Sequence, residues 1–182
     1  MEAAPNNKKR MRGILAAVVC AMVGSATYAQ QDPQFTQYMF DRLSVNPAVA
    51  GTNGTICATA LLRQQWTGFD GAPKTGLINV QGPLAKINSG IGLSVYVDKL
   101  GQENSTIARL HYAYHFKVGA QSILSAGIYL GMTGRTLGNK WIAIDPVAND
   151  DAIPAGGASD TGFDMGGGLY YKSPKLWLGV SS

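Results

Sequence analysis

The chain has 182 residues, 23 glycines, 14% charged residues and a formal net charge of +4. Four of its 15 basic residues and one of its 11 acidic residues lie in the first 29 positions, so the rest of the chain is nearly neutral. This distribution of charge excludes a basic nucleic-acid-binding surface. Only one of the two cysteines, Cys57, lies beyond those positions, which excludes an intramolecular disulfide framework.

Residues 1–29 have the pattern of a secretory signal peptide. Four basic residues between positions 8 and 12 precede the apolar stretch 13–24, whose twelve residues are too short for a permanent transmembrane helix. Small residues then lead to Ala29, so we expect cleavage near Ala29 and export of the rest. The alternative is an uncleaved membrane anchor.

Residues 30–53 form a separate N-terminal segment ahead of the first expected strand. Asp32 is a helix N-cap and Pro33 suits the first helical position, so a short helix is predicted. The sequence NPAVAG at 46–51 then predicts a turn that leads into a strand from Gly54. The apolar residues near one face of the expected helix are Phe35, Tyr38, Met39 and Leu43.

The rest of the chain alternates with a period of two, which is typical of β-strands. The pattern is clearest at 105–118 and recurs at 55–66, 90–98, 121–133, 162–172 and 175–181, with a weaker version at 74–82. In the clearest stretch the apolar face carries Thr106, Ala108, Leu110, Tyr112, Tyr114, Phe116 and Val118. The opposite face carries Ser105, Ile107, Arg109, His111, Ala113, His115 and Lys117.

The composition of the polar face indicates a membrane protein. It is rich in Gly, Ser, Thr and Tyr, and the segments are about 9–13 residues long, near the length with which a tilted strand crosses a bilayer. We therefore predict an all-β fold, a transmembrane antiparallel β-barrel formed by residues 54–182, in the outer membrane of a Gram-negative bacterium. An exported β-sandwich that serves as a binding module is the alternative fold.

No group of residues indicates catalysis, a cofactor or a metal site. His111 and His115 are four positions apart, which on a strand separates them by about 13 Å, too far to share an ion. They are better explained as two inward-facing imidazoles. The polar inward face keeps a simple diffusion channel open as an alternative function.

Two stretches resemble signatures of the PorP/SprF family of type IX secretion system membrane proteins: QDPQFTQYMFDRLSVNPAVAG at 31–51 and RQQWTGFDGAPKTG at 63–76. GIGLSVYVDKLG and GGGLYYKSPKLWLGVSS are similar to later strands of that family. The resemblance implies a non-enzymatic outer-membrane β-barrel that works with the secretion or gliding apparatus and supports export or surface attachment of a partner such as an adhesin. Family members continue beyond the position of Ser182, so we expect a C-terminally truncated member with an incomplete barrel.

Two regions are candidates for partner binding. In the N-terminal segment these are Gln34, Phe35, Gln37 and Tyr38, with packing into the lumen or against the periplasmic rim as the alternative. The second region, 66–75, is rich in glycine and proline, and we expect a rim loop packed by Trp66 and Phe69. That loop either docks a secretion partner or only connects two strands.

Overall fold

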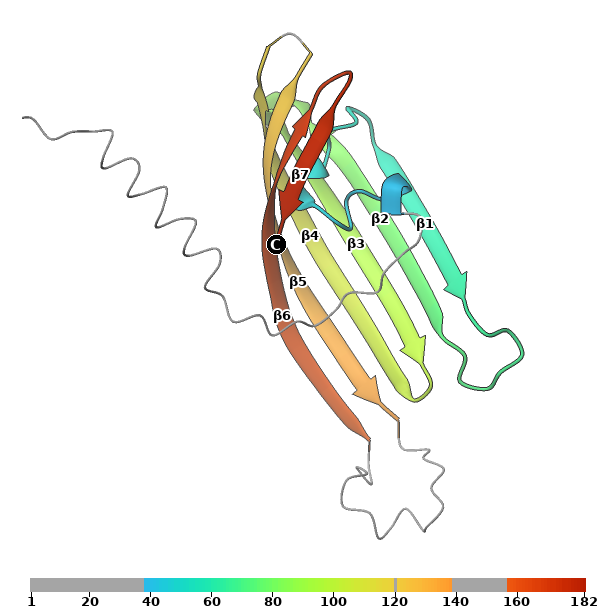
Figure 1. Cartoon of the computed structure of the whole chain (residues 1–182). Coiled ribbons are helices and arrows are strands. Elements are labelled where there is room, and N and C mark those ends of the chain that lie inside the picture. Colours follow the sequence, from blue (N-terminus) through green and yellow to red (C-terminus); the bar gives the residue numbers. More distant parts are fainter. Residues whose placement is uncertain (1–37, 120, 139–156) are drawn as a thin grey trace, which may run out of the picture. The chain divides into compact units, whose positions relative to one another are not determined.

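The computed structural model describes residues 38–119, 121–138 and 157–182, which belong to one unit, Pro33–Ser182. They form a seven-stranded antiparallel sheet in which each strand pairs with its neighbours in sequence (Figure 1). The strands are β1 (Cys57–Gln64), β2 (Lys74–Leu84), β3 (Ser89–Leu100), β4 (Glu103–Lys117), β5 (Ile123–Leu137), β6 (Ala158–Lys172) and β7 (Trp177–Ser181). Three short 3₁₀ turns accompany them: η1 (Tyr38–Phe40), η2 (Pro47–Val49) and η3 (Ala85–Ile87).

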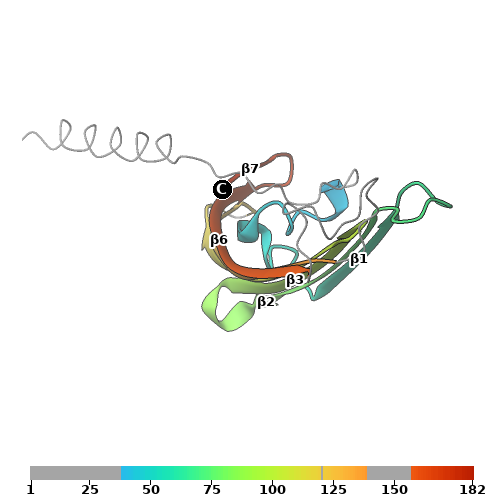
Figure 2. The ribbon, with the colours of Figure 1, turned by 90° about the horizontal axis from the view of Figure 1, so that it is seen from below.

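The sheet curves into an open half-barrel (Figure 2). Within the described residues β1 and β7 are its two edges, because β1 pairs only with β2 and β7 pairs along its length with β6. The prediction of an all-β, incomplete antiparallel barrel is therefore confirmed. The expected signal peptide lies outside the described residues.

None of the helical turns in the described part of the chain is long and apolar enough to cross a membrane.

The period of two read from the sequence separates the convex from the concave face of the sheet. In β4 the odd positions 107–113 are buried on the concave side, whereas the even positions 106–116 are exposed on the convex side. The register aligns outward residues of neighbouring strands, so Leu93, Leu110, Leu130 and Met165 form one apolar row. The predicted division of the faces is confirmed.

The height of this convex apolar surface fits a bilayer. Its outward positions in β4 run from Thr106 to Phe116, a rise of about 33 Å along the strand. At the tilt of about 40° usual for such strands, that rise corresponds to about 25 Å along the membrane normal, the height of the apolar band of outer-membrane barrels.

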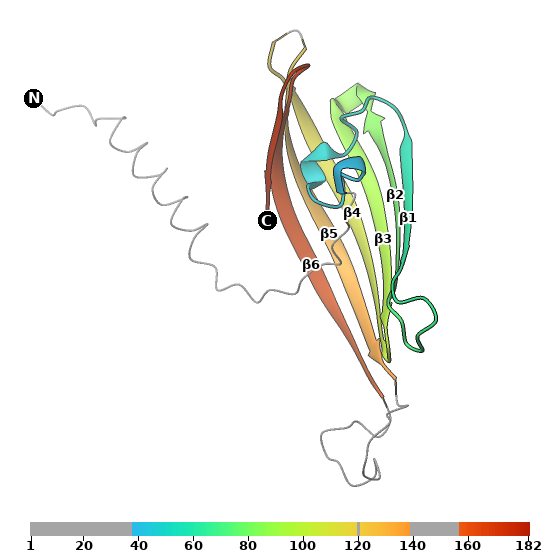
Figure 3. The same ribbon diagram turned by 45° about the vertical axis from the view of Figure 1, so that its right-hand side comes forward.

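The described part of the N-terminal segment, from residue 38 on, lies along the concave face (Figure 3), and we call its residues 41–52 the strap. Leu43, Ala48 and Ala50 of the strap are fully buried, and Leu43 and Ala50 pack with Ala113 of β4. The expected common apolar face of a helix is not formed here, because Met39 is half exposed while Leu43 is buried. The described part of the segment has two 3₁₀ turns.

Candidate functional site

The strap is seated on a row of small residues that crosses the sheet. Gly90, Ala113, Gly127 and Gly168 are in register on β3, β4, β5 and β6, all on the concave face. A Cβ at Gly90 would overlap the carbonyl of Ala50, and a Cβ at Gly127 would overlap the backbone of Ala48. The backbone of the strap therefore lies where larger side chains would otherwise project.

Asn46 fixes the strap to the last two strands. Its Oδ1 accepts a hydrogen bond from the Ala48 amide at 2.9 Å, which caps the turn η2. Its Nδ2 donates to the carbonyls of Leu169 at 3.0 Å and Val180 at 3.3 Å. Gly168 makes room for this side chain, because a Cβ at that position would overlap Asn46 Oδ1.

The beginning of the strap is bound to β2 through Asp41. This carboxylate is buried and accepts hydrogen bonds from Asn79 Nδ2 and Ser44 Oγ. Asn79 Nδ2 also donates to Ser44 Oγ at 2.9 Å. Farther along, the Gly51 amide donates to Gln81 Oε1 at 3.1 Å, so both parts of the strap are held by β2.

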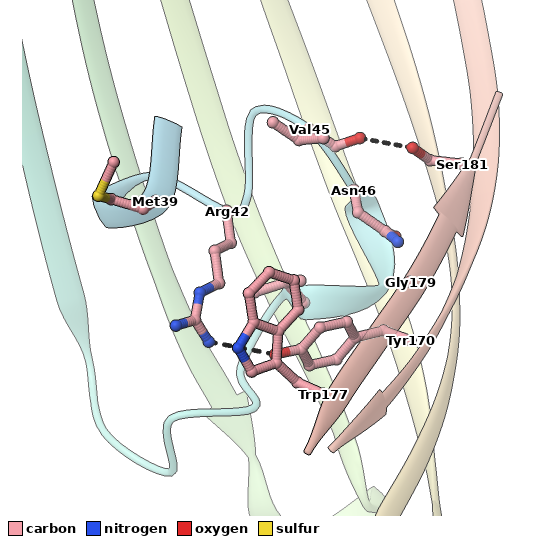
Figure 4. A pocket seen from close by; sticks show the side chains of 9 residues that line it. Met39, Arg42, Val45, Asn46, Tyr170, Trp177, Gly179 and Ser181 are labelled. Carbon is pink, nitrogen blue, oxygen red and sulfur yellow. Dashed lines mark hydrogen bonds between the residues drawn. The ribbon is translucent and has the colours of Figure 1, made fainter. Parts of the chain in front are cut away.

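A pocket of about 100 Å³ lies between the N-terminal segment and strands β6 and β7 (Figure 4). Arg42 forms one wall, with its guanidinium 4.8 Å from the centre of the Trp177 ring and its Nη1 donating to Tyr170 Oη at 3.2 Å. Met39 and Trp177 are each 52% exposed at this pocket. The arrangement suits an apolar side chain held beside a cation, and the lining of this pocket contains no Cys, His, Asp or Glu.

An ion pair crosses β5 elsewhere on the concave face. Arg109 of β4 bonds Asp164 of β6, with Nη2 at 2.5 Å and Nε at 2.9 Å from Oδ2. Gly131 lies between the two in register, so its missing side chain lets Arg109 reach across the strand. Tyr129 Oη donates to the second carboxylate oxygen at 3.2 Å. These bonds link β4 and β6 across β5, which explains the pair as a brace between strands.

The two histidines of β4 also bond neighbouring strands. His111 Nε2 lies 2.8 Å from Ser94 Oγ, and His115 Nδ1 lies 2.8 Å from Ser125 Oγ. Across the described ranges, no group of three or more His, Cys, Asp or Glu side chains could hold a metal ion.

The loop between β1 and β2 presents its two aromatic residues to the surroundings. Hydrogen bonds from the Phe69 amide to the Trp66 carbonyl at 3.1 Å and from the Gln65 amide to the Pro73 carbonyl at 3.0 Å order this loop. Trp66 is 67% exposed and Phe69 is 71% exposed. The prediction that these side chains pack the loop is wrong, because the backbone bonds hold it without them.

Of the predicted binding residues, the structure describes Tyr38, Trp66 and Phe69, and it does not bring Tyr38 together with the other two. Gln34, Phe35 and Gln37 lie outside the described residues, and Tyr38 begins η1. Trp66 and Phe69 follow β1 at the end of the sheet where Lys74 pairs with Lys99, whereas the strap crosses near Gly90.

Sequence reasoning missed the row of small residues and the contacts of Arg42 and Asn46. The signal that could have found the row is the glycine or alanine at inward parity in four successive strands.

Comparison with known proteins identifies one family. The family model described as "Type IX secretion system membrane protein PorP/SprF" matches residues 27–182, which includes the strap and all seven strands. No curated protein and no solved structure matches the chain.

Proposed function

Because the chain belongs to the PorP/SprF family of type IX secretion system membrane proteins, we propose that it acts in the outer membrane, without catalysis, to support export or surface attachment of a partner protein such as an adhesin. Its partners are then the secretion or gliding machinery, the secreted protein and outer-membrane lipid. The chain reaches this membrane after signal-peptide cleavage near Ala29.

The observation that supports a protein-binding role is the strap on the concave face. In a simple diffusion channel the inward positions line water. In this chain several of them instead hold the N-terminal segment, through Asn79, Gln81 and the glycine row. A segment that membrane insertion does not require is thus kept in one place by contacts with β2–β7.

We propose that the partner binds the N-terminal segment and the pocket beside it. Gln34, Phe35, Gln37 and Tyr38 immediately precede the pocket residues Met39 and Arg42 in the chain. Tryptophan and arginine, which meet here as Trp177 and Arg42, are the residue types that most often dominate binding energy at protein interfaces. Trp66 and Phe69 are proposed as a second contact, at the other end of the strands.

Loss of the gene tests the function as a whole. The partner protein is expected to disappear from the cell surface, while the uptake of small hydrophilic solutes stays unchanged. Surface labelling of intact cells and a solute-uptake assay measure the two quantities. If uptake falls while secreted proteins still reach the surface, the diffusion-channel alternative is right and the proposed role is wrong.

Two variants test the binding surface. Deletion of residues 32–37 removes Gln34, Phe35 and Gln37 but leaves the strap, so insertion should persist while surface display of the partner is lost. Trp177→Ala should also reduce display, whereas Leu178→Ala, on the opposite face of the same strand, should not. Equal display from the two point variants would remove the pocket from the proposal.

A further inference from the structure

Two lysines face each other across the convex surface. Lys74 of β2 and Lys99 of β3 are directly opposite in the register, and both are exposed. Like charges in such cross-strand pairs are destabilising. Within the described ranges neither side chain forms an ion pair. The fold therefore places two positive charges at directly opposite positions of neighbouring strands, without an ion pair to either one among the described residues.

The pair marks the end of the apolar band. The row of outward-facing residues that contains the two lysines is polar across six strands: Gln64, Lys74, Lys99, Asn104, Thr136 and Ser159. Two rows farther into the band the outward residues include Ile78, Val95 and Met132. If the convex face meets lipid, as the proposed function requires, the two ammonium groups lie at the level of the lipid head groups.

The same end of the sheet has the longer connections. Residues 65–73 join β1 to β2 and residues 138–157 join β5 to β6 at this end, where β3 and β4 are joined by the short turn 101–102, while the opposite end has only the short connections 85–88, 118–122 and 173–176. Outer-membrane barrels place short turns in the periplasm and longer loops outside the cell. The lysine pair therefore belongs to the outer leaflet.

A cleft of about 1020 Å³ adjoins the two lysines. Residues 68–72 form one side of it and Gly101 and Gln102 form the other, and a hydrogen bond of 3.0 Å from the Gly101 amide to the Gly71 carbonyl joins the sides. Asp70 is the single carboxylate among its lining residues, so the two lysines leave the cleft with a net positive charge. Phe69 adds an exposed aromatic ring of the kind that borders apolar bands.

We propose that Lys74 and Lys99 bind the phosphate group of an outer-leaflet glycolipid in this cleft. A phosphate between the two ammonium groups turns their repulsion into two charge-assisted attractions. An acidic segment of a secreted protein is the other ligand with suitable charge. The position of the pair at the border of the apolar band favours lipid, whose phosphate is held at that depth.

Lipid binding by the full chain in uncharged detergent tests the proposal, with native mass spectrometry as the readout. The probes are phosphorylated lipid A, the same lipid without phosphate, and phosphatidylglycerol. The wild type should prefer phosphorylated lipid A. At about 1 kcal/mol for each lysine, Lys74→Gln/Lys99→Gln should weaken that binding about 30-fold. The control Lys86→Gln/Lys117→Gln removes two lysines from the opposite end of the sheet and should change little.

Thermal unfolding gives a second readout, because the difference in unfolding temperature between the wild type and the double variant should change sign when the lipid is added. Without anionic lipid, Lys74→Gln/Lys99→Gln should unfold at the same or a higher temperature than the wild type, because the repulsion is gone. With phosphorylated lipid A the wild type should become the more stable of the two. A wild type that is already more stable without lipid would show that the lysines serve the fold, and would overturn the proposal.

Other outcomes separate this inference from the proposed function on which it rests. Binding of a polyglutamate peptide but not of phosphorylated lipid A would assign the cleft to an acidic protein segment and overturn the lipid proposal. Equal affinity for phosphorylated and dephosphorylated lipid A would also overturn it. A wild type that fractionates with the outer membrane and exports its partner, yet ignores the phosphate, refutes this inference alone. A wild type absent from that membrane refutes the proposed function.

Discussion

The two faces of the sheet follow different rules. On the convex face, outward residues such as Leu110 and Ile128 are more than half exposed within the described chain, and their apolar character is what matters. On the concave side, the identity of single residues matters. Gly127 leaves room for the backbone of the strap, and Asn46 of the strap forms hydrogen bonds to β6 and β7. Fluid lipid can pack against apolar side chains of any shape, whereas the strap can pack only against positions whose side chains are small enough to leave it room.

The difference predicts how each face tolerates substitution. The convex face should respond to polarity and depth, with little dependence on the shape of the new side chain. The concave face should respond to volume, even when polarity is unchanged. Four experiments separate these responses, in decreasing order of expected effect.

The largest effect is expected for a charge in the middle of the convex face. Leu110→Arg should destabilise the folded protein in lipid by about 2–4 kcal/mol, because the charge lies near the bilayer midplane. Thr106→Arg, at the edge of the apolar band, is the matched control and should lose about 0–1 kcal/mol. Urea unfolding in liposomes measures both values. Equal losses would show that the convex face does not span a bilayer.

A single methyl group should disturb the concave face. Gly127→Ala places a Cβ against the strap backbone and should destabilise the fold by about 1–3 kcal/mol. Gly167→Ala is the control, since its Cβ points outward and meets only ordinary contacts, the nearest at 3.5 Å. Displacement of the strap should also expose the bond after Arg42 to trypsin. Resistance to trypsin equal to that of the control would show that the strap is not seated on Gly127.

Loss of the cap should have a smaller effect. Asn46→Ala removes the hydrogen bond that caps η2 and two bonds to β6 and β7, and it should reduce the free energy of unfolding by about 1–2 kcal/mol. Asn53→Ala, which loses only one exposed contact with Cys57, should stay within about 0.5 kcal/mol. Chemical unfolding of the three proteins compares them. Matching values for the two variants would mean that Asn46 does not fasten the strap.

The smallest effect on stability is expected from single cysteines in a Cys57→Ser background. Leu110→Cys should resist a water-soluble maleimide because lipid covers it, and Ser125→Cys should resist because the position is fully buried on the concave side. Ser105→Cys, near the end of β4 and only partly buried, should be labelled. Labelling of Leu110→Cys in intact membranes would contradict a lipid-covered convex face.

Sequence alone predicted the strands and their faces because alternation is a local property. The stretch 105–118 assigns each of its side chains to one face without any knowledge of the neighbouring strands. The seat of the strap could not be predicted in this way. It requires the register of β3 through β6 before Gly90, Gly127 and Gly168 become a single row.

Contacts between residues far apart in the chain could not be predicted from the sequence either. Arg42 meets Tyr170 across 128 positions, and neither residue type indicates the other. The error at Trp66 and Phe69 has a different cause, because large aromatic residues in a glycine-rich loop were expected to bury themselves. At the edge of a membrane barrel such residues remain outside, where an interface is available to them.

The strap has a consequence for the order of events during assembly. It precedes every strand in the chain, yet Asn46 can bond Val180 only after β7, 134 positions later, has joined the sheet. A slip of one residue in β5 would put Ile128 where Gly127 receives the strap, and docking would fail. The strap therefore comes first in the chain but docks last during assembly. Its docking requires that the strands have already paired in the correct register.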